Sequence, residues 1–122
     1  LSTFVYDTYT GMVGTGLGAD FVAVDRKTLE PVWKTANGPA MVATTAYTGL
    51  TNNIGNISPI RLPDGTLCAP AADGAVHFFS EADGKEKRKI ASGVPYCAGA
   101  ALVGEKTIVV ADLAGDVRAY SI

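Results

Sequence analysis

The chain has 122 residues, which is enough for one domain with a core of its own. Its composition is 48% apolar and 18% charged, and its net charge of −2 excludes the basic surface by which proteins attract nucleic acid. No apolar run approaches the ~18–20 residues that span a bilayer, so we expect neither a nucleic-acid partner nor a membrane span.

The 14 glycines are spread along the chain, which is typical of many short strands and turns. Two cysteines, Cys68 and Cys97, are too few for a disulfide scaffold, and their redox state is left open. The sequence begins with Leu1 rather than Met, so we expect it to start inside a longer protein or after a processed leader.

The first clear element is a strand, a tight turn and a second strand over residues 23–33. Val22 and Val24 lie in a β-branched run, and residues 25–28 have turn-forming side chains. The apolar alternation then resumes up to Trp33. Two antiparallel strands joined by a short polar hairpin are therefore predicted.

An insertion over residues 36–55 separates this unit from the next one. Loops on a rigid scaffold usually carry binding. This loop contains uncharged side chains that can hydrogen bond or stack against sugars or peptides: Tyr47, Thr51, Asn52 and Asn53. We expect these residues to bind a ligand or partner; a long structural loop, or an extra hairpin over 40–48, is the alternative.

Two further units follow the insertion. A shift of 41 residues lays residues 56–80 on 97–121 without a gap, matching Thr66 to Thr107 and Gly74 to Gly115. The second unit predicts strands at 57–62, 66–71, 75–80 and 85–90. The third unit predicts strands at 98–103, 107–111 and 116–121, and its fourth strand is missing. No segment has a sustained 3.6-residue apolar period, so no long helix is expected.

Four-stranded antiparallel units that recur about every 40 residues are typical of β-propeller blades. One small sheet cannot cover both of its faces, so blades stack on one another. We therefore predict an all-β chain that forms a single partial β-propeller domain over residues 1–122, with blades at 1–35, 56–91 and 97–122. Closed propellers have about four to eight blades. The remaining blades are expected from the parent chain or from a homo-oligomer.

Isolated reactive side chains have structural explanations in this pattern. His77 alternates with apolar neighbours in a predicted strand, and Cys68 lies in mid-strand as a buried, inert thiol. Asp73 and Asp112 lie beside turn glycines and are expected to cap turns. The charged run 85–89 is expected to be a solvated edge strand that discourages sheet-to-sheet pairing. No catalytic residue and no metal ligand is predicted.

The run from Ala23 through Asp25 and Thr28 to Trp33 resembles the repeat of pyrroloquinoline-quinone-type (PQQ-like) β-propellers. In that family a small residue, an acid, a Thr-Gly turn and a tryptophan recur in each blade. The resemblance implies structural roles for three of these residues. Trp33 would pack between neighbouring blades, while Asp25 and Thr28 would hold the turn.

The chain also departs from the family pattern. Leu29 stands where glycine is usual, and Arg88 stands in the second unit where the tryptophan would dock. Quinone dehydrogenases of the family bind the quinone and a metal with groups drawn from the whole ring. This chain displays no complete set of such groups, so we expect neither PQQ nor calcium.

The resemblance favours a non-catalytic propeller segment, the C-terminal blades of a larger bacterial protein that binds a protein or carbohydrate ligand. An extracytoplasmic location, periplasmic or cell-surface, is expected. Two alternatives stay open. One is an accessory propeller of an enzyme such as a metallophosphoesterase, with the catalytic domain upstream, and the other is a fragment of a quinoprotein dehydrogenase.

Overall fold

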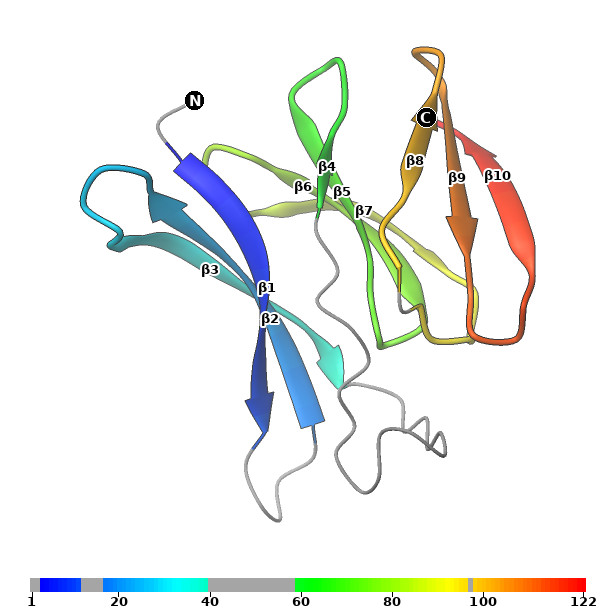
Figure 1. The fold of residues 1–122 in the computed structure, drawn as a ribbon, viewed down its shortest axis with the longest axis horizontal. Helices are drawn as coiled ribbons and strands as arrows, with labels where there is room; N and C mark the ends of the chain where they lie inside the picture. Colours follow the sequence, from blue (N-terminus) through cyan, green and yellow to red (C-terminus); the bar gives the residue numbers. More distant parts are fainter. Residues whose placement is uncertain (1–2, 12–16, 40–58, 97) are drawn as a thin grey trace.

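The computed structural model describes residues 3–11, 17–39, 59–96 and 98–122. These residues form ten strands in three antiparallel sheets, which follow one another in chain order (Figure 1). The described part of the chain contains no helix, and therefore none long and apolar enough to cross a membrane. For these residues the predicted all-β class is confirmed.

The first sheet has the order β1-β2-β3. Its strands are β1 (Thr3–Gly11), β2 (Leu17–Asp25) and β3 (Pro31–Pro39). The predicted strand, turn and strand over residues 23–33 is confirmed, because β2 ends at Asp25 and β3 begins at Pro31. Strand β3 includes residues 36–39, which were predicted to belong to the insertion. The rest of that insertion lies outside the described residues.

The second sheet has four strands in the order β4-β5-β6-β7. They are β4 (Ile60–Arg61), β5 (Thr66–Pro70), β6 (Ala75–Ser80) and β7 (Glu86–Ala91). All four predicted strands are present, and β4 is shorter than the predicted 57–62, of which 57 and 58 lie outside the described residues. The predicted turns contain Gly65, Gly74 and Gly84, which have φ of 80°, 79° and 69°. Glycine adopts this left-handed conformation without steric cost.

The third sheet has the order β10-β9-β8. Its strands are β8 (Ala101–Val103), β9 (Thr107–Ala111) and β10 (Val117–Ser121). Within the described residues β10 pairs with β9 alone, so its other edge carries no strand. A bridge between Tyr96 and Asp112 connects the segment after β7 to this sheet.

Two apolar clusters lie on opposite faces of the second sheet. One joins it to the first sheet and contains Phe21, Leu67, Ala69, Ala71 and Phe79. The other joins it to the third sheet and contains Leu62, Cys68, Val76, Phe78, Tyr96, Ile108 and Val110. Successive side chains of a strand point to opposite faces. Strands β5 and β6 are therefore buried along almost their whole length, and the second sheet forms the centre of the core.

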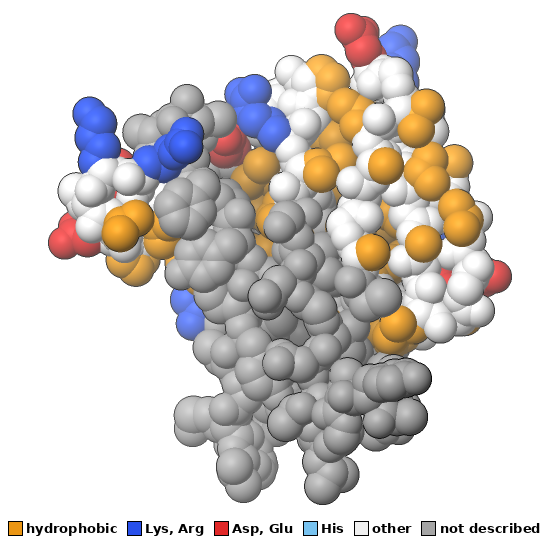
Figure 2. All heavy atoms as spheres, viewed as in Figure 1, with side chains coloured by type: hydrophobic (Ala, Val, Ile, Leu, Met, Phe, Trp, Pro, Cys, Tyr) orange, Lys and Arg blue, Asp and Glu red, His pale blue; other side chains and the backbone are white. Residues whose placement is uncertain are grey.

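The surface of the third sheet is rich in apolar side chains (Figure 2). The large exposed ones are Leu102, Val103, Leu113 and Val117, and Val117 is 70% exposed. A large group of apolar side chains on a protein surface usually marks a site of interaction with another surface.

Candidate binding groove

The binding residues predicted from the sequence, Tyr47, Thr51, Asn52 and Asn53, lie outside the described residues. Among the other places in the described chain that have the geometry of a site, four bring functional side chains together most closely. They are the contact around Trp33, the turn that follows β2, a buried histidine, and a groove between the second and third sheets.

Trp33 lies between the first and second sheets. Its Nε1–H donates a 2.9 Å hydrogen bond to the carbonyl oxygen of Glu81, in the turn between β6 and β7. Its ring meets Phe79 edge to face, with 5.7 Å between the centroids. Thr35 of the same strand donates its hydroxyl hydrogen to the carbonyl oxygen of Gly84. Strand β3 is thus attached to β6 by one ring contact and to the β6–β7 turn by two hydrogen bonds.

Gly84 makes this close approach possible. A Cβ at this position would lie 2.5 Å from Trp33 Cε3 and 2.5 Å from Thr35 Oγ1, and real Cβ atoms essentially never show contacts this short. Glycine is therefore required here for space as well as for its φ of 69°.

Asp25 and Thr28 organise the turn that leads into β3. Asp25 Oδ1 accepts hydrogen bonds from the backbone N–H of Lys27 (2.8 Å) and of Thr28 (3.0 Å). These bonds lower the pKa of Asp25, because they favour the carboxylate, and the bond from Thr28 has the larger effect. Leu29 then takes a φ of 61° where the PQQ-type repeat usually has glycine. The side chains of Asp25 and Thr28 both act on their own turn.

His77 is buried in β6, with only 4% of its side chain exposed, and it lies between two carboxylates. Its Nδ1 lies 2.7 Å from Glu86 Oε2, and its Nε2 lies 3.1 Å from both carboxylate oxygens of Asp73. Phe21 of the first sheet contacts the ring edge to face at 6.5 Å. Burial alone would lower the pKa of His77, but the hydrogen bonds to Asp73 and Glu86 outweigh burial and raise it. The predicted packed histidine is confirmed, with an ionic partner on each nitrogen.

Three other sequence predictions for single residues are also confirmed. Cys68 is a free, fully buried cysteine, and burial raises the pKa of its thiol to about 12, so it stays protonated at neutral pH. Asp73 Oδ1 accepts from the N–H of Ala75 at 3.1 Å, and Asp112 Oδ1 accepts from the N–H of Ala114 at 3.0 Å, as expected of turn caps. The charged side chains of β7 are exposed.

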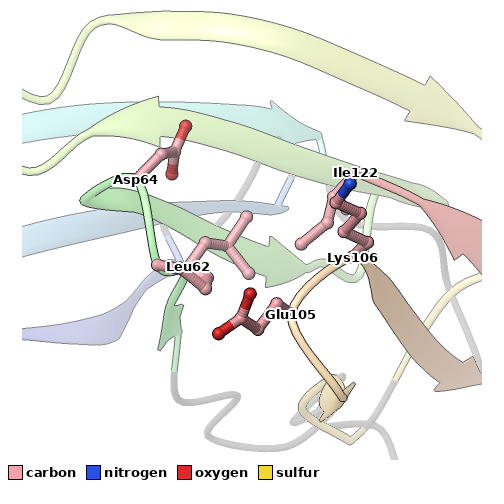
Figure 3. A pocket seen from close by; sticks show the side chains of 6 residues that line it. Leu62, Asp64, Glu105, Lys106 and Ile122 are labelled. Carbon is pink, nitrogen blue, oxygen red and sulfur yellow. The ribbon is translucent and has the colours of Figure 1, made fainter.

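The groove between the second and third sheets has the shape of a ligand site. It consists of two neighbouring cavities, of about 340 and 210 Å³, that share Leu62, Asp64 and Ile122. We call it the inter-sheet groove. Its apolar floor is Leu62, Phe78 and Ile122, and its charged rim is Asp64, Lys87, Arg88, Glu105 and Lys106. Figure 3 shows the Leu62 side chain, which lines the 340 Å³ cavity, between the hairpin that carries Asp64 and the turn that carries Glu105.

Hydrogen bonds fix one part of the rim. Asp64 accepts hydrogen bonds from the N–H and from the hydroxyl of Thr66, both at 2.8 Å. Both bonds lower the pKa of Asp64, and the bond from the backbone N–H has the larger effect. Lys87 Nζ donates to the same Thr66 hydroxyl at 3.0 Å. The guanidinium of Arg88 lies over the ring of Phe78, 4.2 Å from the centroid, in a cation–π contact. The Asp64 carboxylate is therefore largely satisfied by the protein itself.

The acidic side chains of the groove rim do not form a cluster of the kind that binds a metal ion. Within the described chain, no group of three or more His, Cys, Asp or Glu side chains is placed to hold a metal ion.

Sequence reasoning missed the inter-sheet groove, because its lining comes from two sheets that are separate in the sequence. One signal pointed toward it. Arg88 of β7 lies opposite Phe78 as Trp33 of β3 lies opposite Ala23, so the two sheets carry different side chains at corresponding positions.

Comparison with known proteins supports the fold. No protein-family model and no curated protein matches the sequence. Among solved structures 28 chains match, and one of them is BamB from Moraxella catarrhalis, with a TM-score of 0.57 and 16% sequence identity. That match covers 94% of this chain and 35% of BamB, so the chain spans about a third of the length of the protein it matches. At this identity the likeness shows the fold, which is that of blades of a β-propeller, as predicted from the repeat.

Proposed function

We propose that this chain is a non-catalytic segment of a β-propeller with PQQ-type repeats, and that its blades form a scaffold that binds a protein or another ligand. The observation that carries the proposal is the inter-sheet groove, which has an apolar floor and a charged rim on two firmly packed sheets. Concave sites with a few polar groups on a rigid scaffold are where ligands usually bind. In this proposal Asp25, Thr28 and Trp33 hold blades in place and do not touch the ligand.

The proposal extends to the parent protein. The chain aligns with about a third of a longer propeller, which supports the idea that further blades belong to the same protein. We place that protein in a bacterium and outside the cytoplasm, and we assign it neither PQQ nor calcium. Adding both to the full-length protein should leave its absorbance spectrum unchanged; a specific new band would favour the quinoprotein alternative instead.

Site-specific photo-crosslinking in the full-length parent protein tests the binding role. Benzoylphenylalanine would replace Glu105 on the groove rim in one variant, and exposed Glu30 in the turn of the first sheet in a matched control. We expect a covalent adduct with a second polypeptide at position 105 and none at 30. The partner, identified by mass spectrometry and purified, should bind the parent protein. A crosslink only to another part of the same chain, or no adduct, would contradict the binding role.

A further inference from the structure

A basic side chain lies at the same repeat position of the second and third sheets, His77 on β6 and Arg118 on β10. Each lies two residues before an aromatic side chain, Phe79 or Tyr120, that packs toward the preceding sheet. Side chains two residues apart on a strand point to one face, so His77 faces the first sheet and Arg118 faces the second. We call the contact of the first and second sheets the first junction, and that of the second and third sheets the second junction.

Carboxylates hold the basic side chain at both junctions. Each ring nitrogen of His77 has a carboxylate within 3.1 Å. Arg118 Nη1 lies 3.1 Å from Asp112 Oδ2, and its Nη2 donates a 2.8 Å hydrogen bond to Asp116. The two junctions therefore share one arrangement, a cation between two carboxylates.

The two basic side chains differ in how they titrate. The guanidinium of Arg118 keeps its charge at every pH at which proteins are folded. Burial alone would lower the pKa of His77, but the hydrogen bonds to Asp73 and Glu86 outweigh burial and raise it above 6.5. The imidazolium is therefore present below pH 6.5 and is lost as pH rises through the folded pKa. Only the first junction has a cation that a change of pH removes.

Loss of this proton leaves a buried carboxylate without its donor. A neutral imidazole donates from one nitrogen only. The side chains of His77 and Asp73 are 4% and 7% exposed, and Phe21 of the first sheet, which contacts the ring, is 1% exposed. The other charged side chain at this place is Lys89, opposite His77 on β7. An ionised carboxylate without a partner is unfavourable until water reaches it. Water reaches this face when the first sheet moves away.

The first sheet has a second attachment, which contains no titrating group. Trp33 and Thr35 of β3 donate hydrogen bonds to carbonyl oxygens of the turn that follows β6. Asp73 lies in the turn that precedes β6, at the other end of the strand. The first junction can therefore open at the Asp73 end while the Trp33 contact stays in place.

We propose that the first junction is a pH-dependent hinge: when His77 loses its proton, the first sheet swings away from the second about the Trp33 contact. Arg118 keeps its charge, so the second junction stays closed.

Paramagnetic relaxation by a soluble nitroxide tests the hinge in the full chain. The probes are the methyl groups of Ala69 and Val110, which lie 41 residues apart at the same repeat position and are 0% and 2% exposed. We expect the nitroxide to relax Ala69 several-fold faster above the midpoint of the His77 titration than below pH 6.5, and Val110 equally at both. An Ala69 that stays shielded at both pH values, or a Val110 that becomes accessible with it, would overturn the proposal.

Two variants separate the charge of the ring from its packing. His77→Gln is uncharged at every pH, so Ala69 should be accessible at both pH values; shielding equal to that of the native chain below pH 6.5 contradicts the hinge. Glu86→Gln removes a 43% exposed carboxylate that favours the imidazolium, and it should move the opening to lower pH. Glu105→Gln, on the exposed turn of the third sheet, is the matched control and should leave the midpoint unchanged. Should His77→Gln fail to fold, an unmoved midpoint in Glu86→Gln is the result that refutes the proposal.

Discussion

Gly84 and Trp33 are fitted to each other at the scale of single atoms. The glycine leaves the space that the indole and the Thr35 hydroxyl occupy, and the turn supplies both carbonyl acceptors. Such contacts depend on the missing Cβ as much as on the residues that are present.

Replacing Gly84 with alanine tests two requirements for glycine at this position, the left-handed backbone conformation and the close approach of Trp33 and Thr35. A residue with a Cβ costs about 1–2 kcal/mol in a left-handed conformation. Gly104→Ala is the matched control, because Gly104 has a φ of 62° but no atom lies within 4 Å of the place that its Cβ would take. We expect Gly84→Ala to lower the free energy of unfolding in urea by clearly more than the control. Equal losses would show that the close approach of Trp33 has no energetic weight.

Trp33→Ala removes the ring contact with Phe79 and the hydrogen bond to Glu81. We expect a loss of about 3 kcal/mol in the free energy of unfolding, the lower end for a large aromatic, because Trp33 is only partly buried. Val32→Ala, one residue earlier in β3 and 52% exposed, should change stability by less than about 0.5 kcal/mol. A near-neutral Trp33→Ala would mean that the indole does not hold the two sheets together.

His77 links protonation to the packing of the first two sheets. The groups that face it are Asp73 and Glu86, which bond its nitrogens, Lys89 opposite it on β7, and the uncharged ring of Phe21. Only the imidazolium donates from both nitrogens, so the two carboxylates favour the charged ring. Its pKa is raised from 6.5, as NMR titration of this single histidine should show.

The sign of the pH dependence follows from that direction. A raised folded pKa contributes stability that is fully present below the unfolded pKa of 6.5 and is lost as pH rises through the folded pKa. We expect unfolding free energy to fall over this window in the native chain and to stay level in His77→Gln. A native chain whose stability is flat over the same window would exclude the ionic pairing.

At the scale of elements, the central and outer strands differ in how many of their backbone N–H and C=O groups are hydrogen-bonded to neighbouring strands. Strands β5 and β6 have a paired neighbour on both sides and buried side chains on both faces, whereas β10 is paired, among the described strands, only with β9. An edge strand of this kind presents unpaired backbone groups to any other strand.

Amide hydrogen exchange measures this difference in backbone hydrogen bonding directly. We expect the amides of β5 and β6 to exchange slowest and the amides of β10 that face away from β9 to exchange faster by at least about a hundredfold, because local opening is easiest at an unpaired edge. The measurement belongs at low protein concentration. Protection of β10 equal to that of β5 there would mean that another strand covers the edge.

At the scale of the whole molecule, the third sheet is exposed on the face opposite Ile108 and Val110. Val103 and Val117 lie on that open face and are 56% and 70% exposed. A blade with one open apolar face is stabilised by another surface.

We therefore expect this chain by itself to associate. Sedimentation velocity should show an s-value that rises with concentration, and the double variant Val103→Lys/Val117→Lys should remove the rise. Val32→Lys, on the exposed surface of the first sheet, is the control and should leave association intact. A monomer at every concentration that binds no hydrophobic dye would contradict the expectation.

Much of the fold follows from local signals along the chain. Turn glycines such as Gly65 and Gly74 and the continuous apolar run between them locate β5, β6 and their turns to within a residue or two, because both signals act over neighbouring residues. The repeat then predicts the blade architecture. The predicted binding residues of the loop stay a prediction, because they lie outside the described residues. The inter-sheet groove was not found from the sequence, because it joins residues 62 and 122.

The sequence alone determined that this is an all-β chain of repeated hairpins, and the resemblance to PQQ-type repeats implied a docking role for Trp33, with Arg88 at the corresponding position of the second unit. Only the tertiary structure decided what surrounds these two side chains. The guanidinium of Arg88 lies over Phe78 of its own sheet, and Leu62 and Ile122 line the groove beside it from two different sheets. A cavity depends on distances between chain segments far apart in sequence, and no local pattern of residues contains those distances.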